Sequence, residues 1–176
     1  MSNSKDLIIY YSRSGNTQAV AELIQEKVAG RLVKLETAQA RPSNYRAEVN
    51  QHVAEQNGHI LPAFNIELPD LRGVDRIFLG TPTWNMALPQ VIISFLRAND
   101  FSGKTIIPFN TNAGYGPGST FRQIASEAKG ANVVEGFTTQ GGQEGKGIML
   151  AIQGERKDAV VKELAVFLSK LEKNKF

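Results

Sequence analysis

The stretch LIIYYSRSGNTQAVAELIQ, residues 7–25, joins an apolar run, a polar turn and a segment with helical spacing. The run at 7–11 is typical of a strand that is buried on both faces of a sheet. Apolar residues then recur from 19 to 24 with the period of an amphipathic helix. The residues between these two segments, 12–17, carry no large apolar side chain. This composition indicates a loop that binds a polar group.

The alternation of strand and helix continues along the 176 residues. It predicts a parallel sheet with helices on both faces, which is a three-layer α/β/α sandwich. No repeat or linker divides the sequence, so we expect one domain over residues 1–176. The predicted strands are 7–11, 31–37, 75–80, 104–109 and 132–139. The predicted helices are 19–28 ending at Gly30, one within 41–64 ending near Gly58, one from Pro89 through 96, 121–128 ending at Gly130, and 156–171.

The composition excludes several classes of protein. The absence of cysteine rules out disulfides, thiolate metal sites and cysteine nucleophiles, and it suits a cytoplasmic protein. No apolar run reaches the ~18 residues of a membrane span, and the polar residues 1–6 do not resemble a signal peptide. The cations behind the net charge of +3 form no clustered stripe, so we expect no nucleic-acid partner. His52 and His59 are isolated histidines, and we expect no metal site.

Ligands of open parallel sheets bind beyond the carboxyl ends of the strands, so the segments that follow the strands are candidate sites. Three of them, 12–17, 81–87 and 111–119, are rich in hydroxyl groups, amides and glycine. None of the three contains an aspartate, a glutamate or a histidine. The loops therefore offer no candidate general acid or base for the ligand, apart from the hydroxyl of Tyr115.

The loop 12–17 opens a helix, and free backbone N–H groups together with the helix dipole favour an anion there. Its hydroxyl and amide side chains add donors, and Gly15 lets the backbone approach a ligand closely. The loop is therefore typical of a phosphate cradle. The alternative is a well-capped turn with surplus polar residues, in which Asn16 or Thr17 caps the helix.

Other phosphate-binding and phosphorylated folds fit this loop less well. It lacks the lysine of a Walker loop. It has one glycine where a Rossmann loop has three, although Glu36 lies near the position of the Rossmann acid. A receiver-type phosphorylation domain needs aspartates where this chain has Ser12 and Thr81.

Trp84 is the only tryptophan, and it follows a predicted strand at a position where a core residue would be out of place. An aromatic ring beside a phosphate cradle indicates a surface on which a planar group stacks. Tyr115 could offer a second ring face. For both residues the alternative is a packing role over the end of the sheet. The three loops together predict a mononucleotide with a planar ring.

These motifs resemble those of the flavodoxin-like family over nearly the whole chain. SRSGNT at 12–17 resembles the FMN-phosphate signature of that family. FLGTPTW at 78–84 resembles the loop whose tryptophan lies against the isoalloxazine ring. FSGKTIIPF at 101–109, followed by TNAG at 111–114, resembles the fourth strand and the loop at the edge of the ring.

The resemblance implies a five-stranded parallel sheet in the order 2-1-3-4-5 and non-covalently bound FMN. Relatives often have a second aromatic residue or a glycine where this chain has Asn85 and Met86, and asparagine tolerates a positive φ. The resemblance implies that the first loop surrounds the phosphate and that the other two lie by the ring. The implied cofactor-binding residues are Ser12, Arg13, Ser14, Gly15, Asn16, Thr17, Pro82, Thr83, Trp84, Asn85, Met86, Thr111, Asn112, Ala113, Gly114, Tyr115 and Gly116.

The resemblance further implies redox electron transfer. The protein would be either an electron carrier for a redox partner protein or an FMN-dependent reductase of a small acceptor such as a quinone, with NAD(P)H as donor. The alternative is a binding module that keeps the fold but has lost the flavin. Homodimers are common among relatives. We predict that 141–147 is a flexible connection, with a lid or a docking surface near the flavin as the alternative. The segment 41–64 is long for a connection in this fold, and long loops are often functional.

Overall fold

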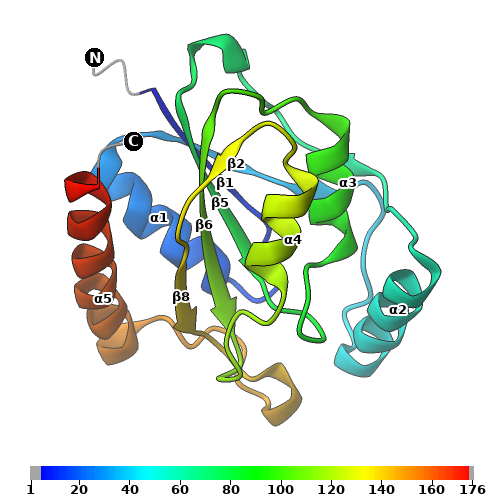
Figure 1. Cartoon of the computed structure of the whole chain (residues 1–176). Helices are drawn as coiled ribbons and strands as arrows, with labels where there is room; N and C mark the ends of the chain where they lie inside the picture. The colour runs from blue at the N-terminus through cyan, green and yellow to red at the C-terminus, as the bar shows by residue number, and fades with distance from the viewer. Residues whose placement is uncertain (1–4, 175–176) are drawn as a thin grey trace.

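The computed structural model describes residues 5–174, which form a central sheet between two layers of helices (Figure 1). The strands of the sheet are β1 (Asp6–Tyr10), β2 (Arg31–Lys34), β5 (Arg76–Pro82), β6 (Thr105–Asn112), β7 (Asn132–Val133) and β8 (Phe137–Gln140). Their order is β2-β1-β5-β6-β7, β8 also pairs with β6, and every pair is parallel. The predicted fold class and strand order are confirmed, with six strands in place of five.

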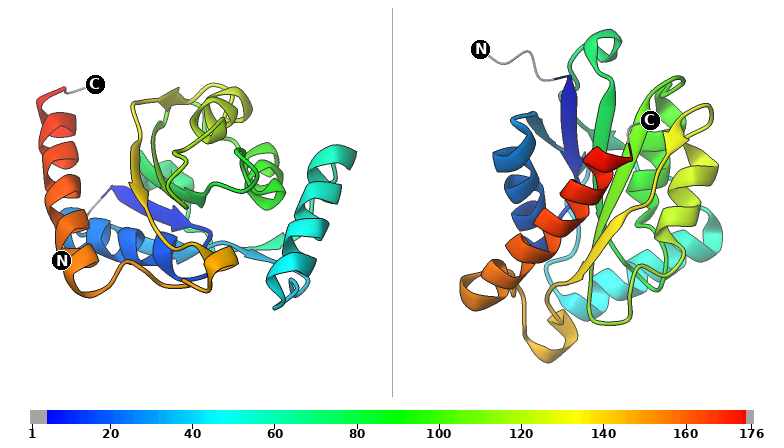
Figure 2. Two further views of the ribbon diagram at one scale, coloured as in Figure 1. Left: turned by 90° about the horizontal axis from the view of Figure 1, so that it is seen from below. Right: turned by 60° about the vertical axis from the view of Figure 1, so that its left-hand side comes forward.

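Helices cover both faces of the sheet (Figure 2). The helices are α1 (Asn16–Val28), α2 (Tyr45–Gly58), α3 (Gln90–Ala98), α4 (Thr120–Glu127) and α5 (Gly154–Lys173). Side chains alternate along β1, so Leu7 and Ile9 join the core under α3 and α4, while Ile8 and Tyr10 join the core under α1 and α5. This explains the continuous apolar run. Within residues 5–174, no helix has the length and apolar character that a bilayer crossing requires.

α2 belongs to neither layer. It lies at the carboxyl-terminal end of the sheet, at the lower right of Figure 1, and ends at Gly58 as the sequence predicts. The 3-10 turn η2 (Glu144–Lys146) lies at the same end of the sheet (Figure 1). A second 3-10 turn, η1 (Leu71–Gly73), precedes β5.

The predicted second strand, 31–37, is divided between two sheets. After β2 ends, the N–H of Leu35 still donates to the carbonyl of Tyr10. The chain then leaves the main sheet, and β3 (Glu36–Thr37) pairs antiparallel with β4 (Phe64–Asn65).

The predicted fifth strand, 132–139, is also divided. β7 pairs with β6 up to Val133, and β8 resumes the pairing at Phe137, opposite Phe109. Pro108 of β6 lies between the two paired stretches. Because proline has no N–H, it cannot continue the hydrogen-bond ladder, and the edge strand separates from β6 at this point.

β5 and β6 extend further than the sequence predicts. Thr81 and Pro82 belong to β5, and Thr111 and Asn112 belong to β6. These four residues are therefore held by the sheet and not by flexible loops.

The ends of α1 differ from the prediction. Gly15 is the N-cap, with φ 96°, and no side chain caps the helix. At the other end, Ala29 and not Gly30 adopts the left-handed conformation, with φ 55°. Gly30 is required for space, because a Cβ there would lie 2.8 Å from the carbonyl oxygen of Asp6.

Candidate functional site

A cavity of about 340 Å³ lies at the carboxyl ends of β1, β5 and β6, where the three predicted loops meet. Its volume lies within the range of small-ligand pockets. The predicted residues that line it are Ser12, Arg13, Ser14, Asn16, Thr17, Pro82, Thr83, Trp84, Asn85, Thr111, Asn112 and Ala113. The predicted residues outside its lining are Gly15, Met86, Gly114, Tyr115 and Gly116.

The loop 12–17 presents donors to this cavity. Helix α1 starts directly after Gly15, and its first intrahelical bond runs from Ala19 N to Gly15 O, at 2.9 Å. The N–H groups that precede Ala19 in the first turn therefore have no partner within the helix. The hydroxyl oxygens of Ser12 and Ser14 accept hydrogen bonds from Gly15 N and from the Asn16 amide. Both hydroxyls keep their own hydrogen for a ligand.

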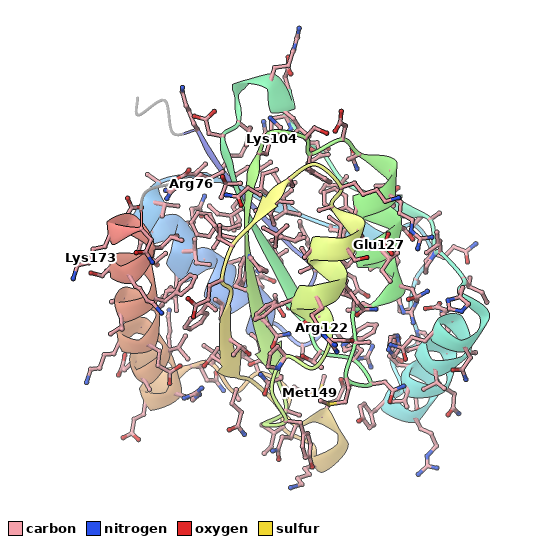
Figure 3. The ribbon with its side chains drawn as sticks, in the orientation of Figure 1. Arg76, Lys104, Arg122, Glu127, Met149 and Lys173 are labelled. Atoms are coloured by element: carbon pink, nitrogen blue, oxygen red, sulfur yellow. The ribbon has the colours of Figure 1, made fainter. Side chains whose placement is uncertain are left out.

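The Asn16 side chain is occupied by the protein itself. Its Oδ1 accepts from the backbone N–H groups of Ala151 and Ile152, at 2.9 and 3.1 Å. Its Nδ2 donates to Ser14 Oγ and to the carbonyl of Met149, the residue labelled at the lower end of the molecule in Figure 3. The amide thus fastens the segment 149–152 to the loop. Only the backbone N–H of Asn16 is left for an anion.

Trp84 forms one wall of the cavity and is held by three neighbours. Its ring meets the rings of Tyr11 and His52 edge-on, with centroids 5.5 and 5.0 Å apart. The guanidinium carbon of Arg41 lies 5.6 Å from the centre of the ring. Burial raises the pKa of Tyr11 to about 12, so this neighbour is a neutral phenol at physiological pH. The ring is therefore both packed against the protein and exposed to the cavity.

Trp84 begins a tight turn that ends at Ala87, with reciprocal backbone hydrogen bonds of 2.9 and 3.0 Å between the two residues. Asn85 and Met86 have φ of 50° and 60°, as in type I′ turns. The positive φ expected to be tolerated at Asn85 is thus observed. The turn is fixed from outside as well, because the carbonyl of Met86 accepts from both the N–H and the hydroxyl of Ser119.

Helix α2 holds the other side of this turn. His52 Nε2 and Gln56 Nε2 both lie within hydrogen-bond distance of the carbonyl oxygen of Trp84, at 3.1 and 3.2 Å. The Asn85 amide donates to Gln56 Oε1 at 2.9 Å. The carbonyl can only accept, so His52 carries its proton on Nε2.

The third loop contributes less than the sequence predicts. Thr111 and Asn112 line the cavity from the end of β6, and Asn112 Oδ1 accepts from the N–H groups of Gly114 and Gly116. Tyr115 is 80% exposed and lies outside the lining. It does not face the cavity, so the hydroxyl expected beside the ligand is not there.

Titratable side chains that the three loops do not contain also line the cavity. Glu48 and His52 of α2 line the cavity, and so does Glu144 of η2. The loops themselves carry no glutamate or histidine, and these residues reach the site from the segments 41–64 and 141–147. The segment 141–147, predicted as a flexible connection, contains η2 and is closed by backbone bonds between Gln143 and Ile148.

The remaining wall of the cavity was not predicted. It consists of Tyr45, Val49 and Val53 of α2, together with Gly141 and Gly142. The three α2 residues recur every four positions, which places them on one face of the helix. That spacing was the available signal for a wall, but it does not reveal what the face packs against.

His52 gives the fold a dependence on pH. Its side chain is buried, burial lowers its pKa, and its Nδ1 has no partner among the described residues. The unfolded chain therefore takes up a proton on His52 more readily than the folded chain does, and the free energy of unfolding falls as the pH drops through the unfolded pKa of ~6.5.

We expect the free energy of unfolding of His52→Gln to fall less than that of the parent when the pH is lowered from about 7.5 to about 5, as measured by urea titrations. The matched control is His59→Gln, whose free energy of unfolding should fall by as much as that of the parent over the same pH range.

Solved structures share the fold. A crystal structure of a candidate flavoprotein from Bacteroides eggerthii is 27% identical, with a TM-score of 0.70, and the match covers 77% of this chain and 87% of that one. A Lactobacillus acidophilus flavoprotein in complex with FMN is 22% identical, with a TM-score of 0.68 and coverage of 77% and 93%. Oxidised flavodoxin 2 from Bacillus cereus is 22% identical, with a TM-score of 0.55 and coverage of 92% and 93%. No curated protein matches the chain significantly.

A family comparison agrees with these structural likenesses. The sequence profile of a flavodoxin family matches residues 5–148, a span that contains all three loops of the cavity. The resemblance that the motifs indicated is thereby confirmed. The chain belongs to the flavodoxin family.

Proposed function

We propose that this protein binds FMN in the cavity at the carboxyl ends of β1, β5 and β6, and that it transfers electrons through the bound flavin. One observation carries the proposal: the loop 12–17, the Trp84 turn and the end of β6 all face the same cavity. An anion-binding loop and an aromatic wall in one cavity match a ligand with a phosphate at one end and a planar ring at the other.

The phosphate end of the cavity fits a dianion. The start of α1 has N–H groups without a partner within the helix, and the helix dipole favours negative charge at the same end. The hydroxyl groups of Ser12 and Ser14 line the same end and retain a hydrogen to donate. Membership of the flavodoxin family supports FMN as the ligand.

The ring end fits a planar group. Trp84 supplies an aromatic wall, and the residues 82–83 and 111–113 supply backbone and side-chain polar groups at the ends of two strands. Tyr45, Val49 and Val53 of α2 cover the cavity with apolar surface, which limits the access of water. When bound, FMN supplies reversible uptake and release of electrons, and the protein's part is to hold and orient it.

The proposed electron donor and acceptor remain either a redox partner protein or a small-molecule pair such as NAD(P)H and a quinone. The flavin-loaded protein should be mixed with NAD(P)H and a quinone in the absence of other proteins. Rapid oxidation of NAD(P)H supports the reductase. A flavin that stays oxidised for minutes under these conditions supports the carrier.

The binding proposal is tested on protein from which flavin has been removed. We expect added FMN to bind at one molecule per chain, with a shifted visible absorbance spectrum and quenched flavin fluorescence. Titration by fluorescence gives the dissociation constant. A spectrum that stays that of free FMN at every protein concentration contradicts the proposal and supports the alternative, a binding module of this fold that has lost its flavin.

A further inference from the structure

Arg13 has no hydrogen-bond donor to spare for a ligand. A guanidinium has five N–H donors and no acceptor. Its Nε and Nη2 donate to the two carboxylate oxygens of Glu144, at 2.9 and 2.8 Å. Its second Nη2 donor reaches the carbonyl of Ser43. Its Nη1 reaches the carbonyl of Pro42 and the carboxylate of Glu48. All five donors are thus used within the protein.

The charge of Arg13 is also compensated. It belongs to an ion cluster of two arginines and three glutamates, composed of Arg13, Arg41, Glu48, Glu55 and Glu144. The hydrogen bond to Glu144 raises the pKa of Arg13, so the guanidinium stays charged. One negative charge remains in excess over the whole cluster. An anion in the cavity therefore gains little from Arg13, although the residue lies in the middle of the phosphate-loop motif.

The partners of Arg13 come from two segments that are distant in the sequence. Glu48 lies on α2, and Glu144 lies on η2, 131 positions from Arg13. The side chains of Arg13 and Glu144 are each only 16% exposed. A bidentate pair with this little exposure is stronger than an ordinary surface ion pair. Arg13 thus connects the loop to the two segments that complete the cavity wall.

The Arg13–Glu48 pair also separates two cavities. A second cavity of about 320 Å³ lies beside the first, and Ser12, Arg13 and Glu48 line both of them. Loss of the Arg13 side chain would remove part of the partition between them.

We infer that Arg13 is a positioning residue that closes the cavity by holding α2 and η2 against the loop, and that it does not bind the phosphate of the ligand. The expected effect of Arg13 on flavin binding rests on the proposed function. The expected effect of Arg13 on α2 and η2 does not require a flavin.

Flavin binding separates the two roles of Arg13, because riboflavin lacks the phosphate of FMN. We expect Arg13→Gln to weaken the binding of FMN and of riboflavin by the same factor, about tenfold, through faster dissociation. Glu144→Gln should do the same. If Arg13 bound the phosphate, Arg13→Gln would weaken the binding of FMN but not that of riboflavin. Glu144→Gln would then strengthen the binding of FMN, because it would release the guanidinium. Either result overturns the inference.

Hydrogen exchange tests the same inference in flavin-free protein. Arg13→Gln should speed amide exchange in α2 and in residues 141–150, and Glu144→Gln should speed it in residues 141–150. In residues 141–150 the double variant should add little to either single change, since both changes break the contact between Arg13 and Glu144. Unchanged exchange in these segments overturns the inference, whatever the result of the flavin-binding experiment. The matched control is Arg97→Gln, which breaks a bidentate pair with Glu127 of α4, labelled in Figure 3. It should leave exchange in α2 and 141–150 as in the parent.

Parental protein that binds neither flavin contradicts the proposed function. The exchange experiment still decides whether Arg13 holds α2 and η2, so the two failures are distinguishable.

Discussion

Replacing Ser14 by aspartate is expected to weaken FMN binding about a thousandfold and to change riboflavin binding far less. Ser14 lines the phosphate end of the cavity beside the start of α1. A carboxylate there repels a phosphate with about 4 kcal/mol for unit charges ~4 Å apart at an effective dielectric of 20. That energy corresponds to about three powers of ten in the dissociation constant. Fluorescence titration of flavin-free protein with each flavin measures both constants.

The control for this variant is Ser14→Asn, which has nearly the same shape as aspartate and no charge. It should weaken the binding of FMN by much less than the aspartate variant does. The fold should tolerate aspartate, because a negative charge near a helix N-terminus is favourable and the carboxylate can still accept the Asn16 amide bond. Equal losses for FMN and riboflavin would show that the phosphate does not lie in the loop 12–17.

Gly80→Ala is expected to destabilise the fold by about 2–3 kcal/mol. A Cβ at Gly80 would lie 2.3 Å from two atoms of the Phe109 ring. Phe109 is fully buried in the core between the sheet and the helices α1 and α5, so the ring cannot move aside without disturbing its neighbours. Urea unfolding followed by circular dichroism gives the free energy of unfolding for the parent and the variant.

Two companion variants identify the cause of that loss. Gly73→Ala adds the same methyl group where no atom lies within 4 Å, and it should cost far less. Phe109→Leu removes the ring that a Cβ at position 80 would meet. The double variant Gly80→Ala with Phe109→Leu should therefore be more stable than the sum of the two single losses predicts. Strict additivity of the two losses would contradict the proposed clash.

The parts of the fold that could be predicted from the sequence are those with local signals. The apolar run 7–11 marks a strand buried on both faces, and the polar loop that follows marks the end of that strand. The same signals recur before 81–87 and 111–119, and the parallel sheet brings these ends together. The carboxyl ends of neighbouring parallel strands lie at one edge, so the three loops had to share a site.

The division of the last strand has a local signal in the strand beside it. Pro108 stands in the middle of a predicted strand, where its missing N–H interrupts one side of the ladder. The positive φ of Ala29 had no such signal. Alanine rarely adopts this conformation, and no residue pattern around position 29 indicates it.

The roles of α2 and η2 could not be predicted because they depend on contacts between distant positions. The number of polar side chains in the loop 12–17 indicates a ligand-binding loop. Two of them, Arg13 and Asn16, instead hold the segments that cover the site. Spacing within a loop does not distinguish a side chain that faces a ligand from one that faces a partner more than a hundred positions away.

The break opposite Pro108 has a consequence for how the protein behaves at high concentration. Open sheet edges are templates on which a second chain can add a strand, and long, flat edges are the most exposed to this. On the β6 side, the edge consists of β7 with two residues and β8 with four, and the chain bends away between them. Neither piece offers a continuous row of N–H and C=O groups. The same proline that disrupts the ladder thus protects this side of the sheet from aggregation.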